Sequence, residues 1–203
     1  GFGSKAYDKS GNPVTLYTYT LDDDDNATIT AYKGNATALV IPSTIDGYTV
    51  VAIGNGAFRG NVKLAAVMIP DTVTKIEDSA FSGCTGLTDI SLPKNLKTLG
   101  VDAFYGCSGL TSVLIPKTVE NTQHYYNGRF SPFRGCNNLQ TFRFEDGMTR
   151  IPDTILCYCT AKLDIVIPDS VTEIGDSAFR NSGLVTVMIP DTVTKIEDSA
   201  FSG

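Results

Sequence analysis

The sequence contains no tryptophan and a single histidine, His124. It has no nucleophile elbow, phosphate-binding loop, zinc motif or Gly-rich dinucleotide loop, and no recognisable nucleophile motif lies near His124. Spacing alone leaves open the possibility of two carboxylates that form a glycoside-hydrolase active site. However, aspartates recur at one position of a repeat (Asp71, Asp169 and Asp191), which is typical of a solvated turn. The sequence therefore predicts a protein that is not an enzyme and that holds no cofactor.

Excess positive charge and long apolar runs are also missing. The formal net charge is −6, whereas nucleic-acid binding needs a basic stripe that displaces counterions, and anionic lipid also attracts basic segments. No run of about 18 apolar residues is present. The sequence therefore predicts neither a nucleic-acid partner nor membrane insertion within this chain.

The chain is built from internal repeats. Residues 67–83 read VMIPDTVTKIEDSAFSG, and residues 187–203 are identical to them. Weaker copies align on the aromatic residue of an Ala-Phe pair with spacings of 23, 23, 29, 23, 23 and 22 residues: Phe58, Phe81, Phe104, Phe133, Leu156, Phe179 and Phe201. A period of 23 falls inside the leucine-rich-repeat range.

Each unit contains a strand and a turn. Apolar residues alternate, as in Leu64, Val67 and Ile69, until a proline ends the strand, and Val73 and Ile76 then point inward. The following Asp-Ser-Ala-Phe segment is expected to form a short 3₁₀ or helical turn. These parts predict a leucine-rich-repeat solenoid of the α/β horseshoe class, mostly β. We expect about seven right-handed coils, one parallel β-sheet, and the aromatic residues stacked in an interior column.

The unit LxxIxIPxTVTxIxxxAFxGCxxL resembles the BspA-like leucine-rich repeats of bacterial surface proteins. The resemblance covers residues 39–203, in which Ile-Pro, Val-Thr-x-Ile and Ala-Phe-x-Gly-Cys recur at fixed spacing. Glu145 departs from the pattern by replacing proline, and Pro132 and Ile155 replace alanine. The resemblance implies a secreted or surface-attached bacterial protein, associated with adhesion to host proteins or to other cells.

Both ends of the chain differ from the repeat. Residues 14–21 and 27–32 alternate as strands around the turn-forming residues 22–26, which predicts a β-hairpin cap within residues 1–38. Asp22, Asp24 and Asn26 have the spacing of a calcium loop, but Ala27 and Lys33 stand where an EF-hand needs Gly and Glu, so a solvated turn is favoured. The solenoid of residues 39–203 is expected to be truncated within a repeat.

Four of the five cysteines share one register, three residues after the aromatic position: Cys84, Cys107, Cys136 and Cys159. Adjacent coils lie within disulfide range, but the parallel Cβ vectors of a ladder oppose closing a bridge. Free cysteine is a good small buried side chain. The sequence therefore predicts a column of buried, reduced thiols, with some bridging or metal binding as alternatives. Cys157 is expected to be exposed outside this column.

Two surfaces are candidates for ligand binding. One is the central outward row of the strands, which is largely apolar: Met68, Ser91, Leu114, Arg143, Val166 and Met188. The other is a six-residue insertion that carries His124, Tyr125, Tyr126 and Arg129. Exposed apolar stripes and repeat insertions often mark binding sites. The alternatives are exposed apolar residues without a role and an insertion that only packs its tyrosines on the coil.

These observations favour an extracellular protein-binding or adhesion module on a bacterial surface. The expected partner is a host or cell-surface protein or glycan, and we expect it to contact Arg143, the insertion, or both. Two alternatives remain open: the chain is a structural spacer or display stalk within a larger polypeptide, and Arg143 only forms a local pair with Glu145.

Overall fold

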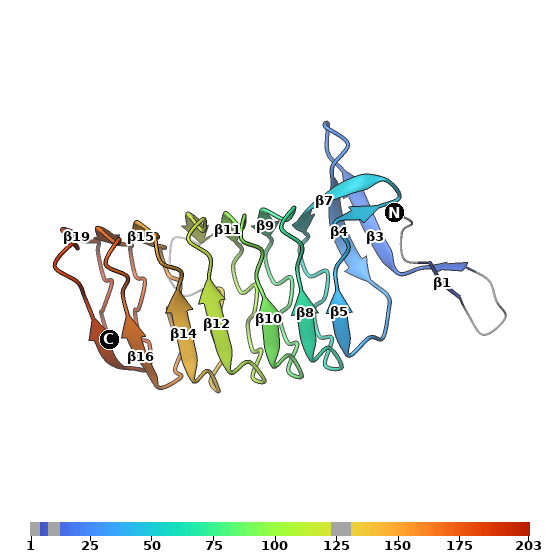
Figure 1. Ribbon diagram of the computed structural model, residues 1–203. Helices are drawn as coiled ribbons and strands as arrows, with labels where there is room; N and C mark the ends of the chain where they lie inside the picture. The colour runs from blue at the N-terminus through green and yellow to red at the C-terminus, as the bar shows by residue number, and fades with distance from the viewer. Residues whose placement is uncertain (1–4, 8–12, 123–130) are drawn as a thin grey trace.

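The computed structural model describes residues 5–7, 13–122 and 131–203 of the chain. Within these ranges the chain winds into a stack of coils, each of which contributes one strand to a row along one face (Figure 1). We call this row the strand face. Neighbouring strands run parallel, so that Leu39, Val67 and Ile90 lie side by side. Its strands are β5 (Ala38–Val40), β8 (Ala66–Met68), β10 (Asp89–Ser91), β12 (Ser112–Ile115), β14 (Thr141–Phe144), β16 (Leu163–Val166) and β18 (Leu184–Met188). The solenoid predicted from the repeat is confirmed.

The inward and outward positions follow the alternation in the sequence. Val67 and Ile69 are each 3% exposed, whereas Met68 between them is 54% exposed. This is the period of two residues that places successive side chains on opposite faces of a strand. The apolar inward positions of all coils therefore join one continuous core.

A second row of short parallel strands runs along another side of the coils (Figure 1). Four of its two-residue strands, β9, β11, β15 and β17, bury an isoleucine or leucine, as at Ile76, Leu99 and Ile174. In β13 the buried residue is Thr122, and in the last coil Ile196 is 51% exposed. The prediction of one parallel sheet is therefore wrong, because two rows join the coils. The strands of the second row are β7 (Tyr48–Ile53), β9 (Lys75–Ile76), β11 (Thr98–Leu99), β13 (Asn121–Thr122), β15 (Arg150–Ile151), β17 (Glu173–Ile174) and β19 (Lys195–Ile196).

The strand face is itself interrupted twice. The hydrogen-bonded groups are β5, β8 and β10, then β12 and β14, then β16 and β18. We call the interruption between β10 and β12 the first seam, and the one between β14 and β16 the second seam. The repeat pattern alone predicts unbroken pairing at both places.

An antiparallel hairpin continues the second row at the N-terminal end. Strands β3 (Tyr17–Leu21) and β4 (Ala27–Tyr32) pair with each other, and β4 pairs with β7 (Figure 1). In the connecting turn, the Asp22 carboxylate accepts the N–H groups of Asp24 and Asn26 at 3.0 and 2.8 Å. These hydrogen bonds, that of Asn26 first, lower the pKa of Asp22. The carboxylate thus stabilises the turn itself. Of the remaining strands, β1 (Lys5–Tyr7) and β2 (Pro13–Thr15) pair antiparallel with each other. Strand β6 (Thr44–Ile45) pairs antiparallel with β7.

The turns opposite the strand face are not helical, contrary to the prediction. Between residues 77 and 84, alternate N–H groups bond within the turn: Ala80 to Glu77, Ser82 to Ser79, and Cys84 to Phe81. The N–H groups between them bond to carbonyls of the next coil: Ser79 to Val101, Phe81 to Ala103, and Gly83 to Tyr105. A 3₁₀ helix would need every N–H to bond within the turn. Ser79 (φ 55°) and Gly83 (φ 74°) adopt left-handed backbone angles that also break a helix.

The aromatic residues stack in the interior, as predicted. Ring centroids of Phe58, Phe81, Phe104 and Phe133 follow one another at 4.8, 5.3 and 5.2 Å, with nearly parallel planes. The spacing matches the distance between coils, so each ring packs on the ring of the next coil. Hydrophobic burial along the column therefore links neighbouring coils.

Leu156 occupies the aromatic position of one coil and interrupts the ring column. Two phenylalanines of β14 bridge the interruption. Phe142 contacts Phe133 edge-on at 5.3 Å, and Phe144 contacts Phe179 edge-on at 6.4 Å. In the paired strand β12 the same positions hold Val113 and Ile115. The larger rings thus occupy the region next to the smaller Leu156.

The aligned cysteines form a buried column of free thiols. The thiols of Cys84, Cys107 and Cys136 each donate to the carbonyl of a phenylalanine in the preceding coil at 3.1 Å. Burial raises the pKa of Cys136 and Cys159, so both are protonated at neutral pH. The predicted exposure of Cys157 is wrong: the side chain is 0% exposed, and burial raises its pKa to about 11.

We expect the native protein to react slowly with a thiol reagent, because thiolate is the reactive form and these side chains are buried. In denaturant without reductant, titration should reach five thiols per chain. A count of one or three in denaturant would instead show disulfide bridges.

Candidate functional site

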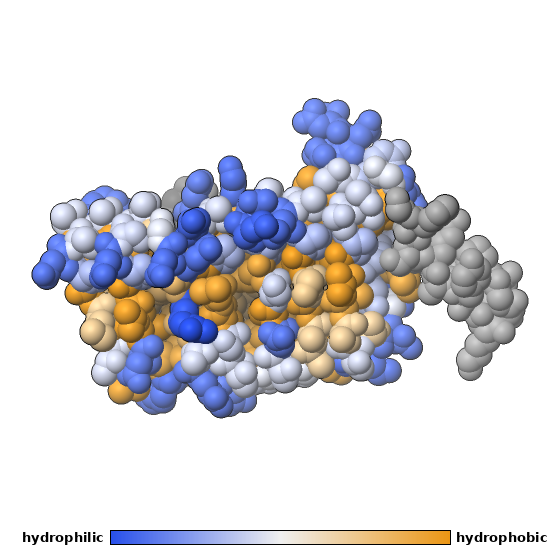
Figure 2. Space-filling model, in the orientation of Figure 1, coloured by the Kyte–Doolittle hydropathy of each residue, from blue (hydrophilic) through white to orange (hydrophobic). Residues whose placement is uncertain are grey.

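The central row of the strand face is exposed along its whole length. Met68, Leu114, Val166 and Met188 are 54, 51, 63 and 66% exposed, and Ser91 and Arg143 are also exposed. Val40, at 69%, extends the row by one coil. Figure 2 shows an apolar band along this side of the molecule, bordered by polar margins. A contiguous apolar surface of this kind is typical of an interaction site.

Two hollows lie on the strand face, one at each seam. The hollow at the first seam has a volume of about 300 Å³, and its lining includes Ser91, Leu92 and Pro116. The hollow at the second seam has a volume of about 480 Å³, and its lining includes Arg143, Val166 and Pro168. Leu114 and Glu145 line both hollows, so the two form one continuous surface feature around β12 and β14.

Arg143 is the cation of the hollow at the second seam. It lies opposite Leu114 in the paired strand β12, and no carboxylate in the described part of the chain lies within 4.0 Å of its guanidinium. Glu145 instead accepts the N–H of Lys117 at 2.8 Å. The alternative of a local ion pair between Arg143 and Glu145 is therefore not supported by the geometry.

Several other cations of the described chain are engaged in ion pairs. Lys94 lies 2.8 Å from Asp71 and lowers the pKa of that carboxyl group. Arg150 lies 2.7 Å from Asp153 and also pairs with Glu173. These contacts join neighbouring coils or brace a turn. Arg143 differs from them because its charge faces an open hollow.

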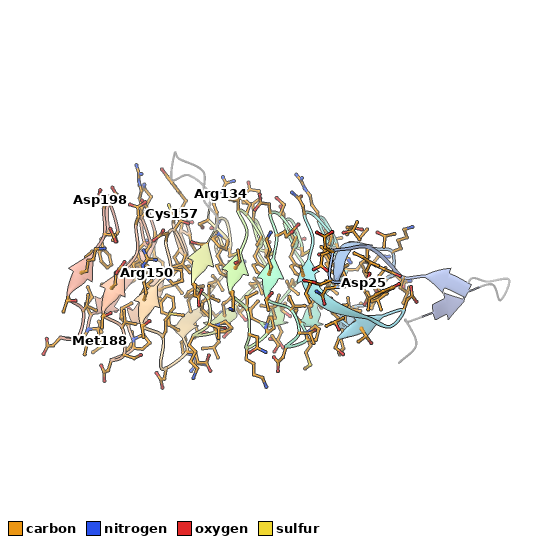
Figure 3. All side chains as sticks on the ribbon, turned by 90° about the horizontal axis from the view of Figure 1, so that it is seen from above. Asp25, Arg134, Arg150, Cys157, Met188 and Asp198 are labelled. Atoms are coloured by element: carbon orange, nitrogen blue, oxygen red, sulfur yellow. The ribbon has the colours of Figure 1, made fainter. Side chains whose placement is uncertain are left out.

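The side of the coils opposite the strand face has a different chemistry. Arg134 pairs with Asp102 at 2.9 Å, and its guanidinium lies 4.3 Å from the centre of the Tyr105 ring. Both charge and ring are thus occupied within the fold. Figure 3 places Arg134 and Met188 on opposite sides of the stack. The strand face, in contrast, carries the exposed aliphatic side chains of Met68, Leu114, Val166 and Met188.

The second predicted candidate, the insertion, lies outside the described residues. His124, Tyr125, Tyr126 and Arg129 all fall within residues 123–130. The described neighbours Thr122 and Ser131 are buried in the stack. A role for the insertion therefore stays a prediction.

Comparison with known proteins addresses the family of the chain. The family model described as "BspA type Leucine rich repeat region (6 copies)" matches residues 31–131 and 128–203. The chain belongs to this family. A comparison with curated proteins finds no match.

Several solved structures resemble this BspA-type repeat protein. A leucine-rich-repeat protein of T. pallidum is 28% identical, with 91% of this chain and 85% of that chain covered and a TM-score of 0.73. A leucine-rich cell surface protein of Faecalibacterium prausnitzii is 34% identical, with 92% and 50% covered and a TM-score of 0.69. A leucine-rich-repeat protein of Bacteroides capillosus is 33% identical, with 65% and 96% covered and a TM-score of 0.57. The BspA-type chain thus spans about half of the cell surface protein.

Sequence reasoning found the exposed row of this BspA-type protein but not the hollows. Phe144, Asp146 and Pro168 line the hollow at the second seam and were not among the predicted site residues. The one available signal was Glu145, which replaces the proline of the repeat at the end of β14. The seams depend on three-dimensional pairing, which the repeat pattern does not report.

In residues 5–7, 13–122 and 131–203, no group of three or more His, Cys, Asp or Glu residues is placed to hold a metal ion. Over the same ranges, no helix has the length and apolar character needed to cross a membrane.

Proposed function

We propose that this chain is a non-catalytic, protein-binding module of a bacterial surface protein, and that the strand face around Arg143 is its binding surface. The proposal rests mainly on one observation: an exposed arginine that forms no ion pair with the described residues lies in a hollow between two exposed aliphatic side chains, Leu114 and Val166. Arginine is enriched among residues that dominate binding energy. The row is presented by paired strands, so little side-chain and backbone entropy is lost when a partner docks.

The family supports the surface location. BspA-type repeats match most of the chain, and one similar structure is described as a cell surface protein. We therefore propose an extracellular location and adhesion to a host or cell-surface protein or glycan. A spacer role is the alternative, and a cation that forms no ion pair within the described chain and lines a hollow of the strand face argues against it.

The proposal is tested by measuring binding of the chain to immobilised fibronectin, fibrinogen, laminin, collagen and a panel of host glycans. We expect one of these ligands to bind, and Arg143→Ala to weaken that binding about tenfold, the effect of losing about 1.4 kcal/mol at a central contact. Arg59→Ala is a matched control, since Arg59 is also exposed and has no ion pair in the described chain.

The control variant should bind as the unmodified chain does. Equal binding by both folded variants would place the functional surface elsewhere. Failure of every ligand in the panel to bind would favour the spacer.

A further inference from the structure

The hollow at the second seam has a charge pattern that restricts its ligand. One cation, Arg143, lies between the exposed aliphatic side chains of Leu114 and Val166 in adjacent coils. In this part of the central row, an aliphatic side chain, a cation and a second aliphatic side chain therefore follow one another along the stack. Glu145 and Asp146 form an acidic rim on the same hollow.

The Arg143 guanidinium, which forms no ion pair in the part of the chain that the structure describes, pairs best with a planar oxyanion, because its N–H groups form a fork that matches a carboxylate. Glu145 does not supply this carboxylate, because among the described residues no carboxylate oxygen lies within 4.0 Å of the Arg143 guanidinium. The oxyanion must therefore come from the ligand.

The acidic rim excludes dense polyanions. Glu145 and Asp146 line the same hollow as Arg143, and the whole chain carries a net charge of −6. A sulfated polysaccharide or a run of acidic residues would be repelled, since like charges at close range are unfavourable. A single carboxylate flanked by neutral, apolar groups meets the same cation with much less repulsion, because it carries only one negative charge.

We propose that the hollow at the second seam binds a protein segment in which one aspartate or glutamate is flanked by aliphatic side chains. The carboxylate pairs with Arg143, and the aliphatic groups contact Leu114 and Val166. Three adjacent coils span about 10 Å. Side chains on one face of an extended chain recur at every second residue, about 6.6 Å apart, so the aliphatic residues that contact Leu114 and Val166 stand two positions before and two positions after the carboxylate. This proposal rests on the proposed function and adds the chemistry of the ligand.

The test uses three synthetic peptides: Gly-Val-Ser-Glu-Ser-Ile-Gly, its Gln analogue and its Lys analogue, all blocked at both ends. Binding to the whole chain is followed by amide NMR shifts. We expect the Glu peptide to shift amides of β12, β14 and β16 and to bind about tenfold more tightly than the Gln peptide, as a charge-assisted pair predicts. The Lys peptide should bind most weakly.

Variants and a second carboxylate source sharpen the result. Arg143→Ala should remove the preference for Glu over Gln, whereas Arg59→Ala should keep it. Equal affinity for the Glu and Gln peptides, or shifts confined to other elements, would overturn the proposal. Tighter Arg143-dependent binding of sialyllactose, a glycan carboxylate, would overturn the protein source of the ligand.

The two proposals fail in different ways. Loss of matrix-protein binding in Arg143→Ala, together with equal Glu and Gln affinities, would overturn the ligand chemistry and leave the binding function standing. Specific binding of the Glu peptide, without binding of any ligand in the matrix panel, would support the ligand chemistry and overturn the proposed adhesion to matrix ligands.

Discussion

Replacing Phe104 by alanine is expected to lower the free energy of unfolding by about 3–5 kcal/mol. The ring is fully buried and stacks on Phe81 at 5.3 Å and on Phe133 at 5.2 Å. Its removal leaves a cavity between two coils, and close-packed neighbours fill such a cavity only partly. Denaturant titration followed by circular dichroism measures the loss as a lower midpoint.

Phe201→Ala is the matched control for this prediction. Phe201 occupies the same register but, among the described residues, stacks on a single ring, that of Phe179 at 5.2 Å, and remains 37% exposed. The same substitution should therefore cost clearly less there. An unchanged midpoint for Phe104→Ala, or equal losses for the two variants, would contradict the interior column.

The interrupted part of the column predicts a strong coupling between Leu156 and Phe144. Leu156→Phe alone should overpack the core and cost about 1–3 kcal/mol. Phe144→Ile alone restores the residue type of the paired strand, Ile115, but leaves a cavity that costs on the order of 1–2 kcal/mol. In the double variant the added ring takes the space of the removed one, so part of both losses should be recovered.

A double-mutant cycle measures this coupling from four unfolding midpoints. We expect an interaction energy of about 1–3 kcal/mol that favours the double variant. Matched substitutions far from the interruption, such as Val73→Ala with Leu156→Phe, should add independently. Additive losses for Leu156 and Phe144 would show that the rings of β14 do not compensate for the missing aromatic residue.

Most of the fold could be predicted from the repeat period. Inward positions such as Val67, Ile76 and Phe81 follow directly from the spacing, because each coil must bury the same positions against its neighbours. The turns did not follow, because the Asp-Ser-Ala-Phe segment has a composition compatible with a helical turn. Every second N–H group of the segment bonds to a carbonyl of the next coil, and these bonds can form only once the coils are stacked.

The candidate site was predicted only in part. The exposure of Met68, Leu114 and Arg143 follows from the alternation of the strands. The hollows do not, because they lie where β10 and β12, and β14 and β16, fail to pair. Cys157 was misplaced for a related reason: an off-register cysteine in a short turn is buried by contacts that no local pattern encodes.

The most direct test of the binding surface is the hydrogen-exchange footprint of the chain in complex with the matrix ligand that it binds. We expect slower exchange in β12, β14 and β16, around Leu114, Arg143 and Val166, and unchanged exchange in the turns at residues 77–84 and 100–107. Protection confined to those turns, or none on the strand face, would contradict the account.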